Sequence, residues 1–216
     1  MKHMTSSEND LDRIARWLGA DWSEDQRTQL GRFQQWLLEE AIAAGGIGPD
    51  EAPRIFDRHI ADSLAFLSLV DASTPTLVDV GSGVGLPAIP IAIARPELLV
   101  TMLDRSERRT QLARRALRIL LLENVRTLTK DVTQVREVFA VSTFRGSLPI
   151  AAATGAFERL TVDQGMGIFA WSRLQQPKSP PDPPPNTIFT LVSKGAGVLD
   201  SPAWFLRIQR SEHSGS

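Results

Sequence analysis

Apolar residues recur at helical spacing in the first third of the chain. Leu30, Phe33, Leu37 and Ala41 fall on one helical face, and glutamines and glutamates fill much of the opposite face. A cluster of glycines then breaks the pattern before a second apolar run begins. Residues 11–70 are therefore predicted to be helical. Three tryptophans in this region are expected to pack in a core: Trp17, Trp22 and Trp36.

From Thr76 onward, short apolar strands alternate with helices. This alternation is typical of a parallel sheet with right-handed crossovers. The expected strands are 76–80, 98–103, 125–129, 138–144 and 167–171. The expected helices are 89–94, 106–122 and 150–160.

The C-terminal part of the chain breaks the alternation. Residues 175–186 contain the run PKSPPDPPPN, which is expected to form an extended loop because proline lacks a backbone donor. Residues 187–193 and 203–209 then fit a closing antiparallel pair of strands. The predicted organisation is a helical extension over 1–73 and an α/β core over 74–216.

Composition narrows the possible functions. The net charge of −1 points to no particular partner, and the absence of cysteine excludes disulfides, thiol nucleophiles and cysteine-ligated metals. His3, His59 and His213 are scattered along the chain, so no metal site is expected. The longest apolar stretch, at 86–94, is too short to span a bilayer, and a cytoplasmic protein is the default expectation.

The run DVGSGVG, residues 79–85, lies where an apolar strand gives way to a helix. Glycines at such a turn let the backbone bend sharply and let a ligand approach closely. The spacing is GxGxG after an acid, whereas dinucleotide oxidoreductases favour GxGxxG. Because an acid repels a pyrophosphate, the motif suits a ligand with a positive amine or sulfonium, such as S-adenosylmethionine (SAM).

Two further acids end neighbouring strands. Asp104 follows Gly85 by 19 positions and can accept hydrogen bonds from both hydroxyls of a ribose. Asp131 comes just after the third strand. It either reaches the adenine amino group or caps the short helix that follows, and the sequence does not decide between the two.

The helix after Asp104 carries a dense basic cluster. Its members are Arg105, Arg108, Arg109, Arg114, Arg115 and Arg118. Arginine binds phosphate through a planar fork, so one interpretation is an RNA-binding surface. The other is a solvated helix face whose arginine stems cover apolar surface.

Four runs of sequence now carry a family resemblance. They are RHIADSLAFL from residue 58, LVDVGSGVGLPAIPIAIARPELLVTMLD from 77, RSERR from 105 and LENV from 122. In this order they resemble the RsmG (GidB) family, the bacterial methyltransferases of guanine N7 in 16S ribosomal RNA. The resemblance is good over about 58–131 and is thinner beyond.

The resemblance implies a class I SAM-dependent methyltransferase fold, a Rossmann-like doubly wound sheet with strand order 3-2-1-4-5-7-6 and an N-terminal helical extension. It implies SAM as cofactor, S-adenosylhomocysteine as product, and ribosomal RNA or the small ribosomal subunit as partner. The expected cofactor-binding residues are Asp79, Gly81, Ser82, Gly83, Gly85, Leu86, Asp104, Arg105, Asp131 and Val132. The expected substrate-binding residues are Arg58, His59, Asp62, Ser63, Arg108, Arg109 and Arg145.

Arg145 is the residue at which the hypotheses differ most. It follows the strand that ends at Phe144, so it is expected at the carboxyl edge of the sheet, where it can donate to guanine O6. The alternative is a surface arginine paired with Glu158 or Asp163. The sequence shows no obvious general base, and none is assigned. This is compatible with methylation of guanine N7, whose lone pair is exposed, so that no proton has to be removed first.

The sequence departs from the family pattern on the substrate side. Gly45–Ile47 replaces an Asn-Leu-Thr element, Ala140 replaces an acid, and the lysine that ends the fifth strand is absent, with Arg173 as its candidate replacement. A methyltransferase of a small molecule or peptide is therefore the second hypothesis. A SAM-binding or RNA-binding module with little activity is the third.

Overall fold

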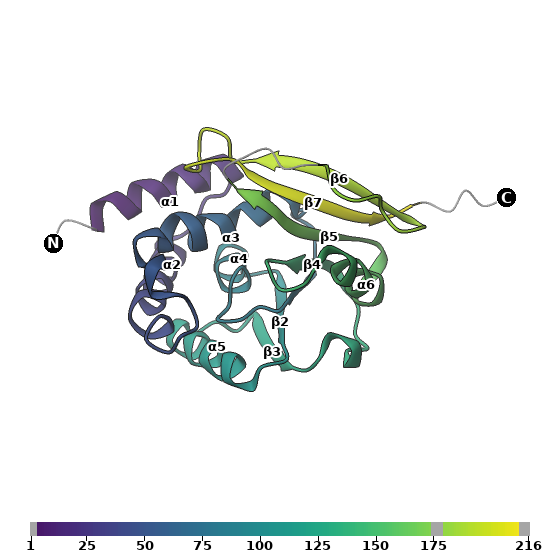
Figure 1. The fold of residues 1–216 in the computed structure, drawn as a ribbon. Coiled ribbons are helices and arrows are strands. Elements are labelled where there is room, and N and C mark those ends of the chain that lie inside the picture. The colour runs from purple at the N-terminus through teal and green to yellow at the C-terminus, as the bar shows by residue number, and fades with distance from the viewer. Residues whose placement is uncertain (1–3, 174–178, 212–216) are drawn as a thin grey trace.

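The computed structural model describes residues 4–173 and 179–211, and a seven-stranded sheet forms its centre (Figure 1). The strands are β1 (Thr76–Val80), β2 (Leu99–Asp104), β3 (Val125–Thr129), β4 (Phe139–Phe144), β5 (Thr161–Arg173), β6 (Thr187–Lys194) and β7 (Ala203–Arg210). Their order is β3-β2-β1-β4-β5-β7-β6. Neighbouring strands from β3 to β5 pair in parallel, whereas β7 pairs antiparallel with both β5 and β6. The predicted fold class and strand order are confirmed.

The first third of the chain is helical, as predicted. Its elements are α1 (Met4–Leu18), α2 (Glu24–Trp36), the π-helix η1 (Leu37–Ala41), the 3-10 helix η2 (Pro49–Arg54), the π-helix η3 (Ile55–Ala61), α3 (Asp62–Ala65) and the 3-10 helix η4 (Phe66–Leu69). Ser23 begins α2 with a capping box, in which its hydroxyl accepts from the Gln26 backbone N–H. Trp22 and Trp36 are each only 4% exposed, and Trp17 packs against the same core, so the packing role of the tryptophans is confirmed.

The helices after β1 lie on both faces of the sheet. They are α4 (Ala88–Ala94), α5 (Glu107–Leu120), the short η5 (Val132–Gln134) and α6 (Ile150–Leu160). One large cluster of buried apolar residues joins the helical extension, α4 and α5 to the sheet, and a second cluster lies between the sheet and α6. Figure 1 shows α6 apart from α2 and α5. The division at residue 73/74 stays a prediction.

The fifth strand differs most from its prediction. It begins at Thr161, directly after α6, whereas the apolar pattern indicated a start at 167. Residues 163–165 are polar or glycine and resemble a turn, yet Thr161 already pairs with Phe139 of β4 before the register shifts. A side chain at position 165 would meet the Ala140 carbonyl oxygen at 2.5 Å, so glycine permits this irregular stretch.

The proline-rich segment is described only in part. Residues 179–184 have no regular secondary structure, as expected, and residues 174–178 lie outside the described part of the chain. His3 and His213 also lie outside it. Within the described residues, no helix is long and apolar enough to cross a bilayer.

Candidate functional site

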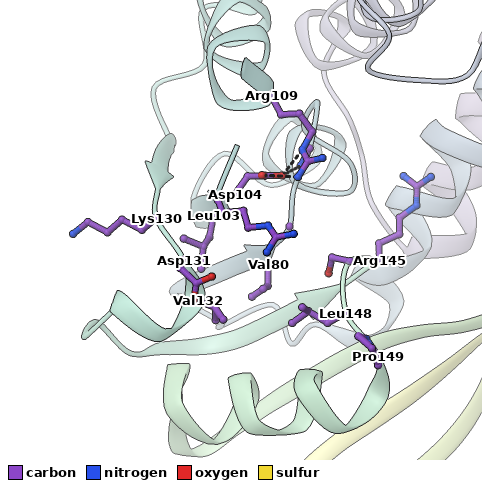
Figure 2. A pocket seen from close by; sticks show the side chains of 15 residues that line it. Val80, Leu103, Asp104, Arg109, Lys130, Asp131, Val132, Arg145, Leu148 and Pro149 are labelled. Carbon is purple, nitrogen blue, oxygen red and sulfur yellow. Dashed lines mark hydrogen bonds and ion pairs between the residues drawn. The ribbon is translucent and has the colours of Figure 1, made fainter. Parts of the chain in front are cut away.

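A cavity of about 590 Å³ lies where β1, β2, β3 and β4 end, at the carboxyl edge of the sheet (Figure 2). We call it the edge cavity. It is lined by Val80, Gly81, Gly83, Leu103, Asp104, Arg105, Arg109, Lys130, Asp131, Val132, Arg145, Gly146, Ser147, Leu148 and Pro149. Open α/β sheets bind their ligands in this position, because loops from adjacent strands diverge there and leave a crevice.

The glycine turn forms one wall of the edge cavity. Gly81, Gly83 and Gly85 all have positive φ, at 73°, 56° and 105°, which disfavours other residues. The N–H groups of Gly81 and Ser82 both donate to the Leu103 carbonyl, which holds the turn against the end of β2. A Cβ at position 81 would lie 2.3 Å from the Ser147 Cβ, so the turn also touches the loop after β4.

Asp104 ends β2 and is fully hydrogen-bonded. One carboxylate oxygen accepts from the Ser106 N–H at 2.8 Å, the other accepts from the Gly83 N–H at 3.0 Å, and the Arg109 guanidinium donates to both. Burial opposes ionisation of Asp104, but these bonds outweigh it and keep the pKa of the carboxyl below its usual value. Arg109 is the exposed partner, with 48% of its side chain accessible.

Asp131 lies at another end of the edge cavity, beside Val132 (Figure 2). Its carboxylate accepts from the backbone N–H of Thr133 at 2.9 Å and from the Thr133 hydroxyl at 2.7 Å. These bonds hold the pKa of Asp131 below its usual value. The capping interpretation is therefore confirmed, and the contact with adenine stays a prediction.

Four of the predicted cofactor-binding residues do not line the edge cavity: Asp79, Ser82, Gly85 and Leu86. The last three shape the turn, since the N–H groups of Gly85 and Leu86 donate to the Ser82 carbonyl. Asp79 is 1% exposed and accepts a hydrogen bond from the Thr143 hydroxyl at 2.9 Å. Its other oxygen, Oδ2, is buried without a hydrogen-bond partner among the described residues. Burial raises the pKa of Asp79 to about 7.

Arg145 follows β4 and lies across the edge cavity from Asp104 (Figure 2). Its guanidinium donates to the Arg58 carbonyl at 3.3 Å and lies 3.0 Å from Nδ1 of His59. The alternative pairing of Arg145 is wrong. The Asp163 carboxylate and the Glu158 carbonyl contact Arg210 instead.

The Arg-His-x-x-Asp-Ser stretch lies behind Arg145 and outside the lining of the edge cavity. His59 is buried and also contacts Glu51 at 3.2 Å, and burial together with the charge of Arg145 lowers its pKa. Ser63 is fully buried, and its hydroxyl donates to the His59 carbonyl four residues earlier. Asp62 instead lies 3.1 Å from Arg173, the candidate replacement for the family lysine.

The basic helix is α5, and most of its arginines have partners within the chain. Arg109 bonds to Asp104, Arg108 donates to the Ala44 carbonyl, and Arg115 pairs with Glu40. Arg114 donates to the hydroxyls of Thr127 and Thr129 in β3. The guanidinium groups are thus engaged within the chain, which neither the RNA-binding nor the solvated-face interpretation predicted, and both stay predictions. Arg108 does not line the edge cavity. Arg105 does line it.

Sequence reasoning missed the loop between β4 and α6. Gly146, Ser147, Leu148 and Pro149 line the edge cavity, and Ser147 Oγ is buried without a hydrogen-bond partner among the described residues. Lys130 was missed as well, and Figure 2 shows its side chain pointing away from the other labelled residues. The sequence could have predicted this contact, because the loop that follows each central strand of such a sheet borders the ligand crevice.

Comparison with known proteins agrees with this geometry. The family profile for rRNA small subunit methyltransferase G (GidB) matches residues 26–171. Ribosomal RNA small subunit methyltransferase G of Thermobifida fusca is 28% identical over 189 residues, which is 82% of this chain and 77% of that protein. The protein of the same name from Kineococcus radiotolerans is 32% identical over 158 residues, 72% of this chain and 60% of that protein.

A solved structure of a mutant of MtNAS is similar in fold alone. Its TM-score is 0.57 at 16% identity, over 87% of this chain and 75% of that one. The family profile, by contrast, covers more than half of the chain in sequence. The chain therefore belongs to the rRNA small subunit methyltransferase G family, and its predicted assignment to the SAM-dependent methyltransferases is confirmed.

Proposed function

We propose that this chain transfers the methyl group of SAM to N7 of a guanine in 16S ribosomal RNA, in the cytoplasm. The substrate is either the small ribosomal subunit or its free RNA. One observation carries the proposal. A single cavity joins a glycine turn and a strand-end aspartate, Asp104, to a partly buried arginine, Arg145, on the opposite side. Family membership supports the same reaction.

The residues of the edge cavity fit SAM. Ser147 Oγ in the lining and Asp79 Oδ2 beneath the turn are buried oxygens without hydrogen-bond partners in the described part of the chain. An amine in the cavity would satisfy the Ser147 oxygen, and the positive charge of the ligand would favour the ionised form of Asp79. Asp104 would hold the ribose and Asp131 with Val132 the adenine, while bound SAM supplies an electrophilic methyl group on its sulfonium.

The carboxylates that line the cavity are poor proton acceptors. The pKa values of Asp104 and Asp131 both lie below the usual value, because hydrogen-bond donors stabilise the ionised forms. A guanine N7 needs no proton removed, so the protein has only to orient the base and exclude water. Arg145 would donate to O6 and thereby hold N7 toward the methyl group.

The test is a transfer assay with methyl-labelled SAM. Small ribosomal subunits, free 16S RNA and an extract of metabolites and peptides are offered as acceptors in parallel. Label recovered as 7-methylguanine in 16S RNA supports the proposal. Label in the extract alone would support the small-molecule or peptide hypothesis, and binding of SAM without any transfer would support the binding-module hypothesis.

A further inference from the structure

A second cavity, of about 180 Å³, shares Arg145 with the edge cavity. Its other walls come from α3 and η4, the end of β5 and the start of β7. Residues that line it include Asp62, Phe66, Arg145, Arg173, Trp204 and Phe205. Because one arginine borders both cavities, a ligand in the second cavity lies beside whatever occupies the first.

The second cavity combines aromatic residues with charged ones. The rings of Phe66 and Phe205 pack edge to face, with centroids 4.9 Å apart, and both are buried. Asp62 and Arg173 supply opposite charges, and most of each side chain is buried. A flat aromatic ring with polar edges matches this combination, since its faces are apolar and its edges form hydrogen bonds.

Two buried polar atoms in this cavity have no hydrogen-bond partner among the described residues: Asp62 Oδ1, an acceptor, and Arg173 Nε, a donor. Asp62 Oδ1 lies 3.1 Å from Arg173 Nη2, which gives charge attraction without the geometry of a hydrogen bond. Buried polar groups left unpaired are costly and therefore rare. An unpaired acceptor beside an unpaired donor points to a ligand that offers both.

We propose that this cavity holds the acceptor guanine, with Asp62 accepting hydrogen bonds from N1–H and the 2-amino group. The inference rests on the proposed function and names the residue that selects the base. In guanine, O6 lies between N7 and N1 on the ring edge. A guanine with O6 at Arg145 therefore directs N7 to one side of that arginine and N1 to the other, where Asp62 lies.

The charge state of Asp62 suits this role. Burial raises the pKa of Asp62 to about 6. The positive charges of Arg173, Arg145 and Arg58 lower it, and the negative charge of Asp200 has a smaller, raising effect. The carboxylate is therefore ionised at and above neutral pH, where it can accept two hydrogen bonds. Adenine has no N1–H and carries an amino group at position 6, so it would set a donor against Arg145 and an acceptor against Asp62. Only an unstacked base can enter such a cavity.

The experiment measures binding of three nucleotides to the protein saturated with S-adenosylhomocysteine. Guanosine monophosphate, inosine monophosphate, which lacks the 2-amino group, and adenosine monophosphate are titrated in turn. The affinity of the unmodified protein for guanosine monophosphate should be about tenfold higher than for inosine monophosphate, which corresponds to one hydrogen bond to a charged group. Its affinity for adenosine monophosphate should be lower still. This comparison needs no substitution, so it does not depend on the folding of a variant.

A matched pair of variants locates the effect. Asp62→Asn should remove the preference for guanosine over inosine monophosphate, whereas Asp200→Asn should keep it, because Asp200 also pairs with Arg173 but does not line the cavity. Absence of guanosine monophosphate binding at millimolar concentration, or a preference that survives in Asp62→Asn, overturns the inference. Failure of the proposed function is distinct, since it shows as absent methyl transfer to 16S RNA by the unmodified protein.

Discussion

A ribose that binds Asp104 has to compete with the hydrogen-bond donors that already contact this carboxylate. A carboxylate offers about four lone-pair sites, and the N–H groups of Gly83 and Ser106 and the two donors of Arg109 occupy them. Arg109 is the exposed donor, so ribose hydroxyls would displace it first. The predicted ribose contact therefore requires the arginine to move.

Asp104→Ala should weaken binding of S-adenosylhomocysteine by about 1.5–3 kcal/mol, because the ribose loses a charged acceptor. Arg109→Ala should leave the affinity unchanged or increase it, because a competing donor is gone. Isothermal titration calorimetry measures both, with thermal melting as the check on folding. Equal weakening in the two variants would contradict the competition.

Burial of Asp79 makes stability depend on pH. Its pKa is raised to about 7 from an ordinary value of 3.8, so the folded protein binds the proton more tightly than the unfolded chain. This contribution to stability is fully present below about pH 4 and is lost as the pH rises to about 7. Asp79→Asn has no such proton and keeps an oxygen for the Thr143 hydroxyl.

Thermal melting of both proteins from pH 4 to pH 8 tests this prediction. The melting temperature of Asp79→Asn should rise relative to that of the unmodified protein as the pH increases. Asp163→Asn serves as the control, because the Asp163 side chain is fully exposed. Parallel curves for the unmodified protein and Asp79→Asn would refute the prediction.

At the scale of elements, the glycine turn depends on its contact with the loop after β4. Gly81 and Gly83 both have positive φ, but only position 81 is crowded: its Cβ would lie 2.3 Å from the Ser147 Cβ, whereas position 83 has no neighbour closer than 4.0 Å. The two glycines therefore separate the cost of backbone conformation from the cost of the contact.

Gly83→Ala should destabilise the protein by about 1–2 kcal/mol, the cost of a left-handed conformation for alanine. Gly81→Ala should cost more and should also weaken binding of S-adenosylhomocysteine, because Ser147 must move. Denaturant unfolding and calorimetry measure the two effects. Ser147→Gly should restore part of the loss in Gly81→Ala, and equal losses in the two glycine variants would rule out the contact.

For the whole molecule, Arg145 is the point at which the sheet, the helical extension and both cavities meet. Arg145→Ala should leave affinity for S-adenosylhomocysteine within about twofold and lower methyl transfer to RNA at least tenfold, about 1.4 kcal/mol. Arg210→Ala is the matched control, since that arginine bonds to the Thr161 and Glu158 carbonyls, and Thr161 pairs with Phe139 at the end of β4 opposite to Arg145. Transfer that changes less than twofold in Arg145→Ala would exclude a role in orienting the base.

The helical extension and the sheet share one apolar core. Leu30, Phe33 and Leu37 belong to the same buried cluster as Leu77 and Ile91. A chain that begins at residue 74 would expose this surface to water, so it should lack a cooperative thermal transition and should bind a hydrophobic dye. A sharp transition in that fragment would show that the core folds without the extension.

Sequence alone determined the features that depend on local pattern. The alternation of short apolar strands with helices indicated the sheet, and the glycine turn at 79–85 with an acid at Asp104 indicated the cofactor. Both signals are local, because the direction of successive side chains and the allowed φ angles depend on adjacent residues. The family resemblance supplied the strand order and the expected substrate-binding roles of Arg145 and Asp62, which local pattern could not give.

Tertiary structure alone decided which side chains meet. Arg145 contacts His59, 86 positions away, and not Glu158 or Asp163. The second cavity needs Asp62 and Arg173 to come together from α3 and β5. Such pairs depend on how helices and strands far apart in the sequence pack together, and a local pattern of apolar residues carries no information about that packing. For the same reason, the sequence indicated Arg145 as a candidate for binding guanine, and only the packed fold brought Arg145 and Asp62 to the same cavity.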